Sequence, residues 1–271
     1  MLADGSSEPS VPVRLRYERP LKDTAFAVIA HRGGGRNSDR LPESENSLGM
    51  IAIAQQFGAN GIEIDVRLTK DGVPILFHDE NFSPRLVNTD YLVGPVSNFT
   101  FAAIRTLGTL KNGERVPTLR EALLTVVDGT GLVTVWLDIK SPDALRPAAQ
   151  LAAEFQRRAD SLGRPLTIYL GLASEELVER YHREGLTAGA NALCEVSVDA
   201  VRSVNARVWA PRWTLGPMRA QAEQLRAEGR RTIVWTLDQK EFITPFFTEN
   251  AVDGILTNYP ALVAFEYHVL P

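Results

Sequence analysis

Two acidic residues stand two positions apart in a segment where charged and aliphatic side chains alternate. Glu63 and Asp65 are separated and flanked by aliphatic residues over positions 61–66, which is the period of a half-buried β-strand. Successive side chains of a strand point to opposite faces, so the two carboxylates share a face and repel each other. Inside a fold such a pair indicates a bound cation, whereas on an edge strand it would be a solvated acidic face.

Two of the four histidines follow apolar runs that predict strands. Residues 25–30 are apolar, as in a strand buried on both faces, and His31 comes directly after them. Asp71 and Gly72 predict a turn, after which a second apolar run leads to His78. An imidazole titrates near neutral pH, so it can accept or donate a proton. His31 and His78 are therefore candidate acid–base groups.

A third acidic residue completes a candidate set of metal ligands. Residues 132–140 predict another strand, and Asp138 lies near its end. Glu63, Asp65 and Asp138 offer only hard oxygen ligands, which favours Ca²⁺ or Mg²⁺ over softer metals. The sequence therefore predicts one divalent cation, either Ca²⁺ or Mg²⁺.

Positive side chains accompany these acids. Arg32 follows His31, and Lys140 lies two positions after Asp138; both could bind a negatively charged phosphate. A metal ion would also offset the charge that develops around phosphorus. Together with two histidines that can move protons, these residues predict metal-assisted cleavage of a phosphodiester.

Strands and helices alternate along the chain, which predicts a parallel sheet covered by helices. Eight such units in 271 residues predict a closed (β/α)8 TIM barrel, whose active site lies at the C-terminal ends of the strands. An open nucleotide-binding sheet fits less well, because the sequence contains no phosphate-binding loop with its Lys-Ser/Thr pair. The predicted strands are 25–30, 61–66, 73–79, 132–140, 167–170, one within 190–213, 231–237 and 252–257.

The domain organisation follows from where this alternation holds. We expect one barrel domain over residues 23–271, with a small cap inserted after the third predicted strand, at about 81–115. Residues 1–22 begin with small and polar side chains and predict a flexible leader. A chain cut after a removed signal peptide would begin in this way. We therefore expect an exported protein, periplasmic, secreted or tethered, while a cytoplasmic location stays open.

The composition limits the classes of partner. The sequence is 44% hydrophobic and 23% charged, with a formal net charge of −4, which gives no electrostatic case for binding nucleic acid. We find no apolar run long enough to predict a transmembrane helix. One cysteine excludes an internal disulfide. We therefore expect a small-molecule substrate.

This sequence resembles the glycerophosphodiester phosphodiesterase family over nearly its whole length. The resemblance implies catalysis by His31 and His78 and a divalent cation on Glu63, Asp65 and Asp138. It implies that the substrate's own neighbouring hydroxyl attacks phosphorus, and that water then opens the cyclic phosphate to give glycerol 3-phosphate. The matching segments are His31-Arg32-Gly33, Glu45-Asn46-Ser47, Glu63-Ile64-Asp65-Val66, Thr69-Lys70-Asp71-Gly72, His78-Asp79, Pro117-Thr118-Leu119-Arg120-Glu121, Asp138-Ile139-Lys140, Trp235-Thr236 and residues 253–260.

Supporting residues follow from the same comparison. Arg32, Lys140 and Trp235 are expected to bind substrate, and the Trp235 ring could hold an ammonium group or a glycerol backbone. Glu45 is expected to orient Arg32 or a histidine. Asn258 and Asp238 stand where the family commonly has Asp and Asn, which affects the expected specificity of the rim.

Two alternatives remain open. The family usually has Glu where Asp138 stands, and sphingomyelinase D-like toxins carry Asp there, so a phospholipase that leaves a cyclic phosphate is one alternative. The chain lacks the closing tail motif of those toxins. The other alternative is a barrel that binds a phosphodiester without cleaving it, although every acid, base and ligand position is filled. The sequence decides neither the alcohol arm of the substrate nor the oligomeric state.

Overall fold

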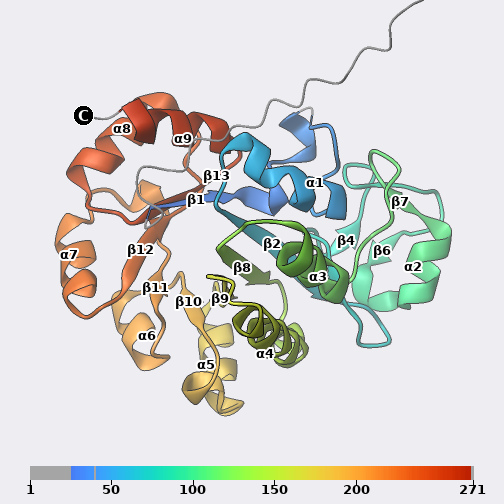
Figure 1. Cartoon of the computed structure of the whole chain (residues 1–271). Coiled ribbons are helices and arrows are strands. Elements are labelled where there is room, and N and C mark those ends of the chain that lie inside the picture. The colour runs from blue at the N-terminus through green and yellow to red at the C-terminus, as the bar shows by residue number, and fades with distance from the viewer. Residues whose placement is uncertain (1–25, 40, 270–271) are drawn as a thin grey trace, which may run out of the picture.

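Eight parallel strands form a closed barrel in the computed structural model, which describes residues 26–39 and 41–269. The first strand pairs with both the last and the second, and these two pairings close the ring (Figure 1). The predicted (β/α)8 TIM barrel is therefore confirmed. The barrel strands are β1 (Ala27–Ala30), β2 (Gly61–Leu68), β8 (Thr134–Ile139), β9 (Thr167–Leu172), β10 (Ala192–Cys194), β11 (Val208–Trp209), β12 (Arg231–Val234) and β13 (Gly254–Thr257).

Helices surround the barrel (Figure 1), and five of those described begin after a Ser or Thr side chain that caps them. The Thr118 side chain accepts a hydrogen bond from the backbone N–H of Glu121, and the Glu121 side chain accepts one from the Thr118 backbone N–H, which forms a capping box. The Ser47 side chain caps the first helix by accepting a hydrogen bond from the Met50 backbone N–H. The helices are α1 (Leu48–Ile53), α2 (Phe101–Leu107), α3 (Leu119–Gly129), α4 (Leu145–Ser161), α5 (Glu175–Arg183), α6 (Val198–Ser203), α7 (Arg219–Ala227), α8 (Lys240–Glu249) and α9 (Pro260–Val269).

The segment predicted as the third barrel strand is not part of the parallel barrel. Its central residues form β3 (Pro74–Leu76), which pairs antiparallel with the end of β2. Gly72, with φ of 76°, turns the chain between the two strands. A parallel pair would need a connection of a dozen or more residues, so this short turn allows only a hairpin. His78 therefore follows a hairpin arm and does not end a barrel strand.

The missing barrel strand comes from the region that the sequence left ambiguous. Residues 190–213 supply two short strands, β10 and β11, where one was counted. Both are buried and pair in register with each other and with their neighbours. The count of eight is thus right, although one predicted member is a hairpin strand and the region 190–213 supplies two strands in place of one.

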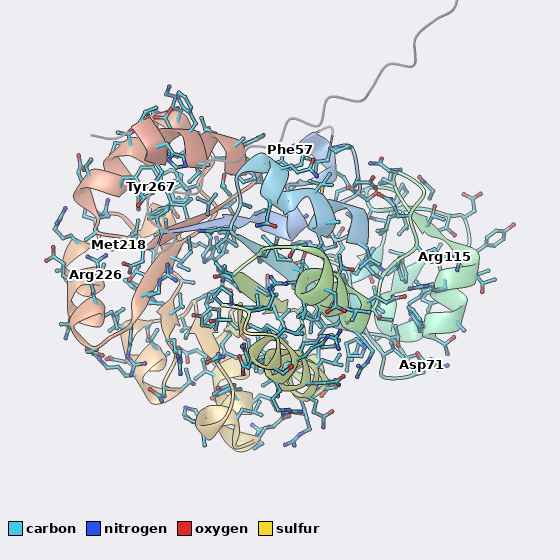
Figure 2. All side chains as sticks on the ribbon, in the orientation of Figure 1. Phe57, Asp71, Arg115, Met218, Arg226 and Tyr267 are labelled. Carbon is cyan, nitrogen blue, oxygen red and sulfur yellow. The ribbon has the colours of Figure 1, made fainter. Side chains whose placement is uncertain are left out.

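Residues 81–115 fold beside the barrel, on the right of Figure 1. They contain the short strands β4 (Asn81–Phe82), β5 (Val87–Asn88), β6 (Gly94–Pro95) and β7 (Thr109–Leu110) together with α2. A separate apolar cluster, which includes Phe77, Phe82 and Ile104, fills this region. Figure 2 labels Arg115 and Asp71 at this side of the molecule. The insertion thus follows the second barrel strand and its hairpin.

The barrel interior is filled below the C-terminal ends of the strands. An inner cluster packs side chains from neighbouring barrel strands, among them Ile29, Trp136, Tyr169 and Ile233. A second, larger cluster joins the outer faces of the strands to the helices. The predicted leader, residues 1–22, lies outside the described residues. Within the described ranges, no helix is both long enough and apolar enough to span a bilayer.

Candidate active site

A cavity of about 780 Å³ opens at the C-terminal ends of the barrel strands. It gathers most of the predicted site residues, which come from strand ends far apart in the sequence. Asp65 and Glu45 are buried in contact with these residues, with 0% and 2% of their surface exposed. The predicted residues that line the cavity are His31, Arg32, Glu63, His78, Asp138, Lys140 and Trp235.

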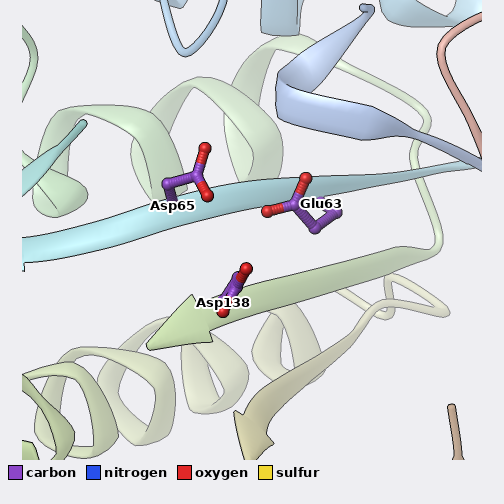
Figure 3. A group of neighbouring side chains, drawn as sticks. All are labelled: Glu63, Asp65 and Asp138. Atoms are coloured by element: carbon purple, nitrogen blue, oxygen red, sulfur yellow. The ribbon is translucent and has the colours of Figure 1, made fainter. Parts of the chain in front are cut away.

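Three carboxylates meet at this site. One oxygen each from Glu63, Asp65 and Asp138 lies within 4.8 Å of the others, and register places Asp65 beside Asp138 on neighbouring strands (Figure 3). Oε1 of Glu63 and Oδ1 of Asp138 are buried and have no hydrogen-bond partner in the described part of the chain. Burial and the neighbouring carboxylates raise the pKa of Glu63. A divalent cation would satisfy both orphaned oxygens and offset this repulsion.

Asp65 differs from the other two acids because one of its oxygens accepts a hydrogen bond from an amide and the other lies in an ion pair. The Asn46 side chain donates to Oδ2 at 2.7 Å, and Lys140 Nζ lies 2.9 Å from Oδ1. Burial alone would raise the pKa of Asp65, but the charges of Lys140, His78 and Arg32 lower it below its usual range. Lys140 also pairs with Asp138, and these two carboxylates keep its own pKa above the usual value despite burial. Asp65 is therefore an anion at neutral pH.

His31 is held by a neutral side chain. Its Nδ1 lies 2.7 Å from Asn258 Oδ1, while Asn258 Nδ2 donates to Asp238 Oδ2 at 2.7 Å. Because the amide oxygen can only accept, Nδ1 carries the proton and Nε2 keeps a free lone pair. Nε2 lies 3.8 Å from Glu63 Oε2. Burial first, and then the Arg32 charge, lower the pKa of His31 to about 4.

His78 is held by an acid. Its Nδ1 lies 2.7 Å from Asp79 Oδ1, and Arg85 Nη2 donates to the same oxygen at 2.7 Å. The Asp79 carboxylate accepts bonds from Arg85 and His78, which lower its pKa although burial opposes them. Arg85 belongs to the insertion and also reaches Glu45 at 3.5 Å. The insertion therefore contributes directly to the position of His78.

The turn after β1 places a buried arginine against the acids. Arg32 has φ of 53°, a conformation that non-glycine residues seldom adopt. In this conformation its backbone N–H donates to Glu63 Oε2 at 2.8 Å, and its guanidinium pairs with Glu45 Oε1 at 2.7 Å. Arg32 Nε lies 3.9 Å from Asp65 Oδ2. The strained turn thus fixes both a metal-ligand candidate and a phosphate-binding candidate.

Trp235 forms part of the cavity wall. Its indole N–H donates to the Ala210 carbonyl at 2.8 Å, which fixes the plane of the ring. The Arg212 guanidinium stacks over that ring at 4.6 Å. One face of Trp235 is therefore covered by a cation of the protein itself.

Several site residues were not singled out in the sequence. Glu195 and Arg212 line the cavity, but they follow β10 and β11, the two strands that were not resolved in advance. An apolar run that ends in a charged residue at 195 was the available signal. Asp238 and Asn258 were noticed as unusual residues, and their direct hydrogen bond shows that they form one unit.

The fold and the acid cluster define a class of barrel suited to phosphodiester chemistry, and the sequence comparisons narrow that class. The model of the glycerophosphoryl diester phosphodiesterase family matches residues 31–262. The chain belongs to this family.

Individual relatives agree with this assignment. The chain is 39% identical over 129 residues to a glycerophosphodiester phosphodiesterase from Caldanaerobacter subterraneus, covering 45% of this chain and 49% of that protein. A Mycobacterium tuberculosis protein named "Probable glycerophosphodiester phosphodiesterase 2" is 29% identical over 251 residues, covering 85% of this chain and 86% of its own. The chain likewise spans only 34–42% of the length of the curated relatives from Homo sapiens, Rattus norvegicus and Bos taurus.

A solved structure shares the fold. The Oleispira antarctica phosphodiesterase, determined in complex with the product sn-glycerol-3-phosphate, superposes with a TM-score of 0.66 at 19% identity, covering 89% of this chain and 96% of that one. At this level of identity the likeness shows the barrel fold.

Proposed function

We propose that this protein hydrolyses glycerophosphodiesters to glycerol 3-phosphate and an alcohol, with a divalent cation and two histidines. The observation that carries the proposal is the carboxylate cluster with two orphaned oxygens, in the same cavity as two imidazoles held through Nδ1. Family membership supports the reaction, as does the product bound to the Oleispira antarctica relative.

His31 is the group suited to accept the first proton. With its pKa lowered to about 4, it is neutral at pH 7, and its Nε2 lone pair is free. In the first step Nε2 takes the proton of the glycerol 2-hydroxyl as that oxygen attacks phosphorus. Removing this proton makes the hydroxyl oxygen a better nucleophile, and general base catalysis of this kind contributes about 10²–10⁴-fold.

His78 is the group suited to protonate the leaving alcohol. The bond from phosphorus to the alcohol oxygen breaks, and His78 Nε2–H gives its proton to that oxygen. The alcohol departs, and the glycerol arm remains as a cyclic phosphate. Asp79 accepts from Nδ1 at 2.7 Å and can stabilise the positive charge that the imidazole carries before the transfer.

The second step reverses both roles. His78 removes a proton from water as the water oxygen attacks phosphorus. His31, now an imidazolium, returns its proton to the 2-oxygen of glycerol as the ring opens. Atoms and protons balance, since one water is consumed and both histidines regain their starting states.

Glu63, Asp65 and Asp138 would hold the cation, which is Ca²⁺ or Mg²⁺ by the oxygen chemistry of the ligands. When bound, the cation polarises the phosphate oxygens and offsets the charge that builds up around phosphorus. Arg32 and Lys140 add positive charge on the same side, although each also pairs with carboxylates.

The direct test is release of glycerol 3-phosphate from glycerophosphocholine and glycerophosphoethanolamine. We expect release that EDTA abolishes and that Ca²⁺ or Mg²⁺ restores. If folded protein releases no glycerol 3-phosphate with either cation, the proposal is overturned. The next assay would then use lysophospholipids and sphingomyelin, the substrates of the toxin-like alternative.

Glu63→Gln tests the metal assignment separately. The amide keeps the shape of the side chain but removes a charge from the cluster, so we expect activity to fall by a factor of about 100 or more through weaker cation binding. The variant should also lose the rise in Tm that the cation gives to the unaltered protein. Glu154→Gln on the surface of α4 is a control that should change neither. Unchanged activity of Glu63→Gln at saturating metal would contradict the assignment.

A further inference from the structure

Glu195 is a half-buried acid of the cavity to which the proposed mechanism gives no task. It follows β10 directly, and β9 stands between β10 and β8 in the sheet. It lines the same cavity as Asp138 and both histidines. Glu195 therefore faces the reaction centre from another sector of the rim, away from β2.

The Glu195 carboxylate lacks a partner. Its Oε1 is buried and has no hydrogen-bond partner among residues 26–39 and 41–269. Two cations, Lys140 and Arg212, act on Glu195 through their charge. Lys140 is paired with Asp65 and Asp138, Arg212 stacks on the Trp235 ring at 4.6 Å, and neither forms an ion pair with Glu195 among the described residues. Burial, and then the charge of Asp138, raise the pKa of Glu195 to about 8. A carboxyl group in such a place is stabilised when a ligand supplies the missing partner.

The walls of the cavity indicate the chemistry of that ligand. Polar and charged side chains line it together with the apolar side chains of Ile139, Leu177, Val196 and Leu215 and the aromatic ring of Trp235. A cation bound beside Glu195 would favour the ionised form of this carboxyl group, and the pair would then gain a charge–charge interaction as well as a hydrogen bond. A neutral hydroxyl would gain the hydrogen bond alone.

The position also fits the length of a substrate. Adjacent strands lie about 4.8 Å apart, so β10 is two such spacings from β8, and the side chains of both strands reach inward. Glu195 and Asp138 are near enough for the charge of Asp138 to act on Glu195, so a short linker would join a phosphate at the carboxylate cluster to a cation on the side of Glu195. Ethanolamine and choline both place an ammonium group two carbons from the phosphate ester.

We propose that Glu195 binds the ammonium group of the alcohol arm and so selects diesters of amino alcohols. This inference rests on the proposed function, which supplies the phosphodiester and places its phosphate. It assigns the cavity wall after β10 to the leaving alcohol and leaves the glycerol arm to the sector that carries the cation ligands.

The test compares substrates that differ only in the charge of the alcohol. We would measure kcat/KM of the unaltered protein and of Glu195→Gln on glycerophosphoethanolamine, glycerophosphocholine and the uncharged glycerophosphoglycerol. We expect Glu195→Gln to lower the ratio of kcat/KM for a cationic substrate to kcat/KM for glycerophosphoglycerol by about tenfold or more. The change should come mainly from KM, since a bond to a charged group is lost. A larger loss on glycerophosphoethanolamine than on glycerophosphocholine would show that the N–H donors contribute in addition to the charge.

Glu176→Gln is the matched control. Glu176 lines the same cavity but is exposed at the start of α5, so water already solvates its charge and the ratio should change less than about twofold. An equal loss of activity of Glu195→Gln on all three substrates, or an unchanged ratio, would overturn the inference.

A binding experiment separates this inference from the proposed reaction. In a His31→Ala background, calorimetry would give the Kd of glycerophosphoethanolamine and of glycerophosphoglycerol with and without Glu195→Gln. We expect the Kd of the cationic ligand alone to rise by about tenfold or more. If the unaltered protein turns over no diester, the proposed function fails, but this difference would still support the ammonium site. Equal changes for both ligands would overturn it.

Discussion

The two histidines of the cavity stand in different surroundings, although both are held through Nδ1. His31 follows β1, is 16% exposed and rests on the neutral amide of Asn258. His78 follows the β3 hairpin, is 30% exposed and rests on the Asp79 carboxylate, which Arg85 of the insertion holds in turn. A neutral, buried imidazole is suited to accept a proton, whereas an imidazole beside an anion is suited to carry one. These different surroundings support the different tasks that we propose for the two histidines.

Removing either imidazole should give the largest effect. We expect His31→Ala and His78→Ala each to lower kcat/KM for glycerophosphocholine by about 10²–10⁴-fold, since each loses a proton-transfer group. Release of glycerol 3-phosphate at saturating cation measures both.

The leaving group can then distinguish the two roles. p-Nitrophenolate leaves without needing a proton, so a p-nitrophenyl diester of glycerol phosphate should largely restore the activity of His78→Ala but not of His31→Ala. Equal rescue, or rescue of His31→Ala alone, would contradict the assignment of base and acid.

A second way to test the comparison is to exchange the partner of His31. The double variant Asp238→Asn, Asn258→Asp keeps a hydrogen bond between the two positions and moves the negative charge next to His31 Nδ1. An adjacent anion favours the charged imidazolium, so the pKa of His31 should rise from about 4 by roughly one to three units. His31 acts as a base only when it is neutral. As pH is lowered, kcat/KM of the double variant should therefore begin to fall at a higher pH than kcat/KM of the unaltered protein.

The pH profile of kcat/KM between pH 4 and 8 measures this shift. Asp238→Asn alone is the control, because it removes the charge without bringing one to His31, and its acidic limb should not move upward. A double variant with an unmoved acidic limb would show that a group other than His31 controls it.

The sequence predicted the parts of the site that depend on local pattern. Strand periodicity placed Glu63 and Asp65 on one face, and register then brought Asp138 beside Asp65. It predicted less well where pairing is decided by contacts distant in sequence. β10 and β11 are three and two residues long, too short to show a period, so Glu195 and Arg212 were missed with them. The hairpin of β3 was counted as a barrel strand because its apolar run does not reveal the direction of pairing.

The residues that hold each histidine through Nδ1 also show that contacts distant in sequence are hard to predict. Asp79 adjoins His78 in the sequence and could be quoted with it. Asn258 lies 227 residues from His31, and only closure of the barrel between β13 and β1 brings them together. A single sequence shows that 238 and 258 carry one acid and one amide, but the pairing of these two residues requires the fold.

The smallest of these effects should come from Arg85, which acts on His78 only through Asp79. Its guanidinium is 45% exposed, and exposed ion pairs contribute about 0.2–1 kcal/mol. We therefore expect Arg85→Ala to lower kcat/KM by less than about tenfold, given 1.4 kcal/mol per factor of ten. The loss should shrink further on the p-nitrophenyl substrate, where His78 need not donate. Arg120→Ala, which breaks an exposed pair with Glu154 on the outer helices, should leave both rates unchanged. Arg85→Ala could instead lower kcat/KM as much as His78→Ala does, and equally on both substrates. That result would mean that Arg85 contacts the substrate itself and that the insertion is part of the binding site.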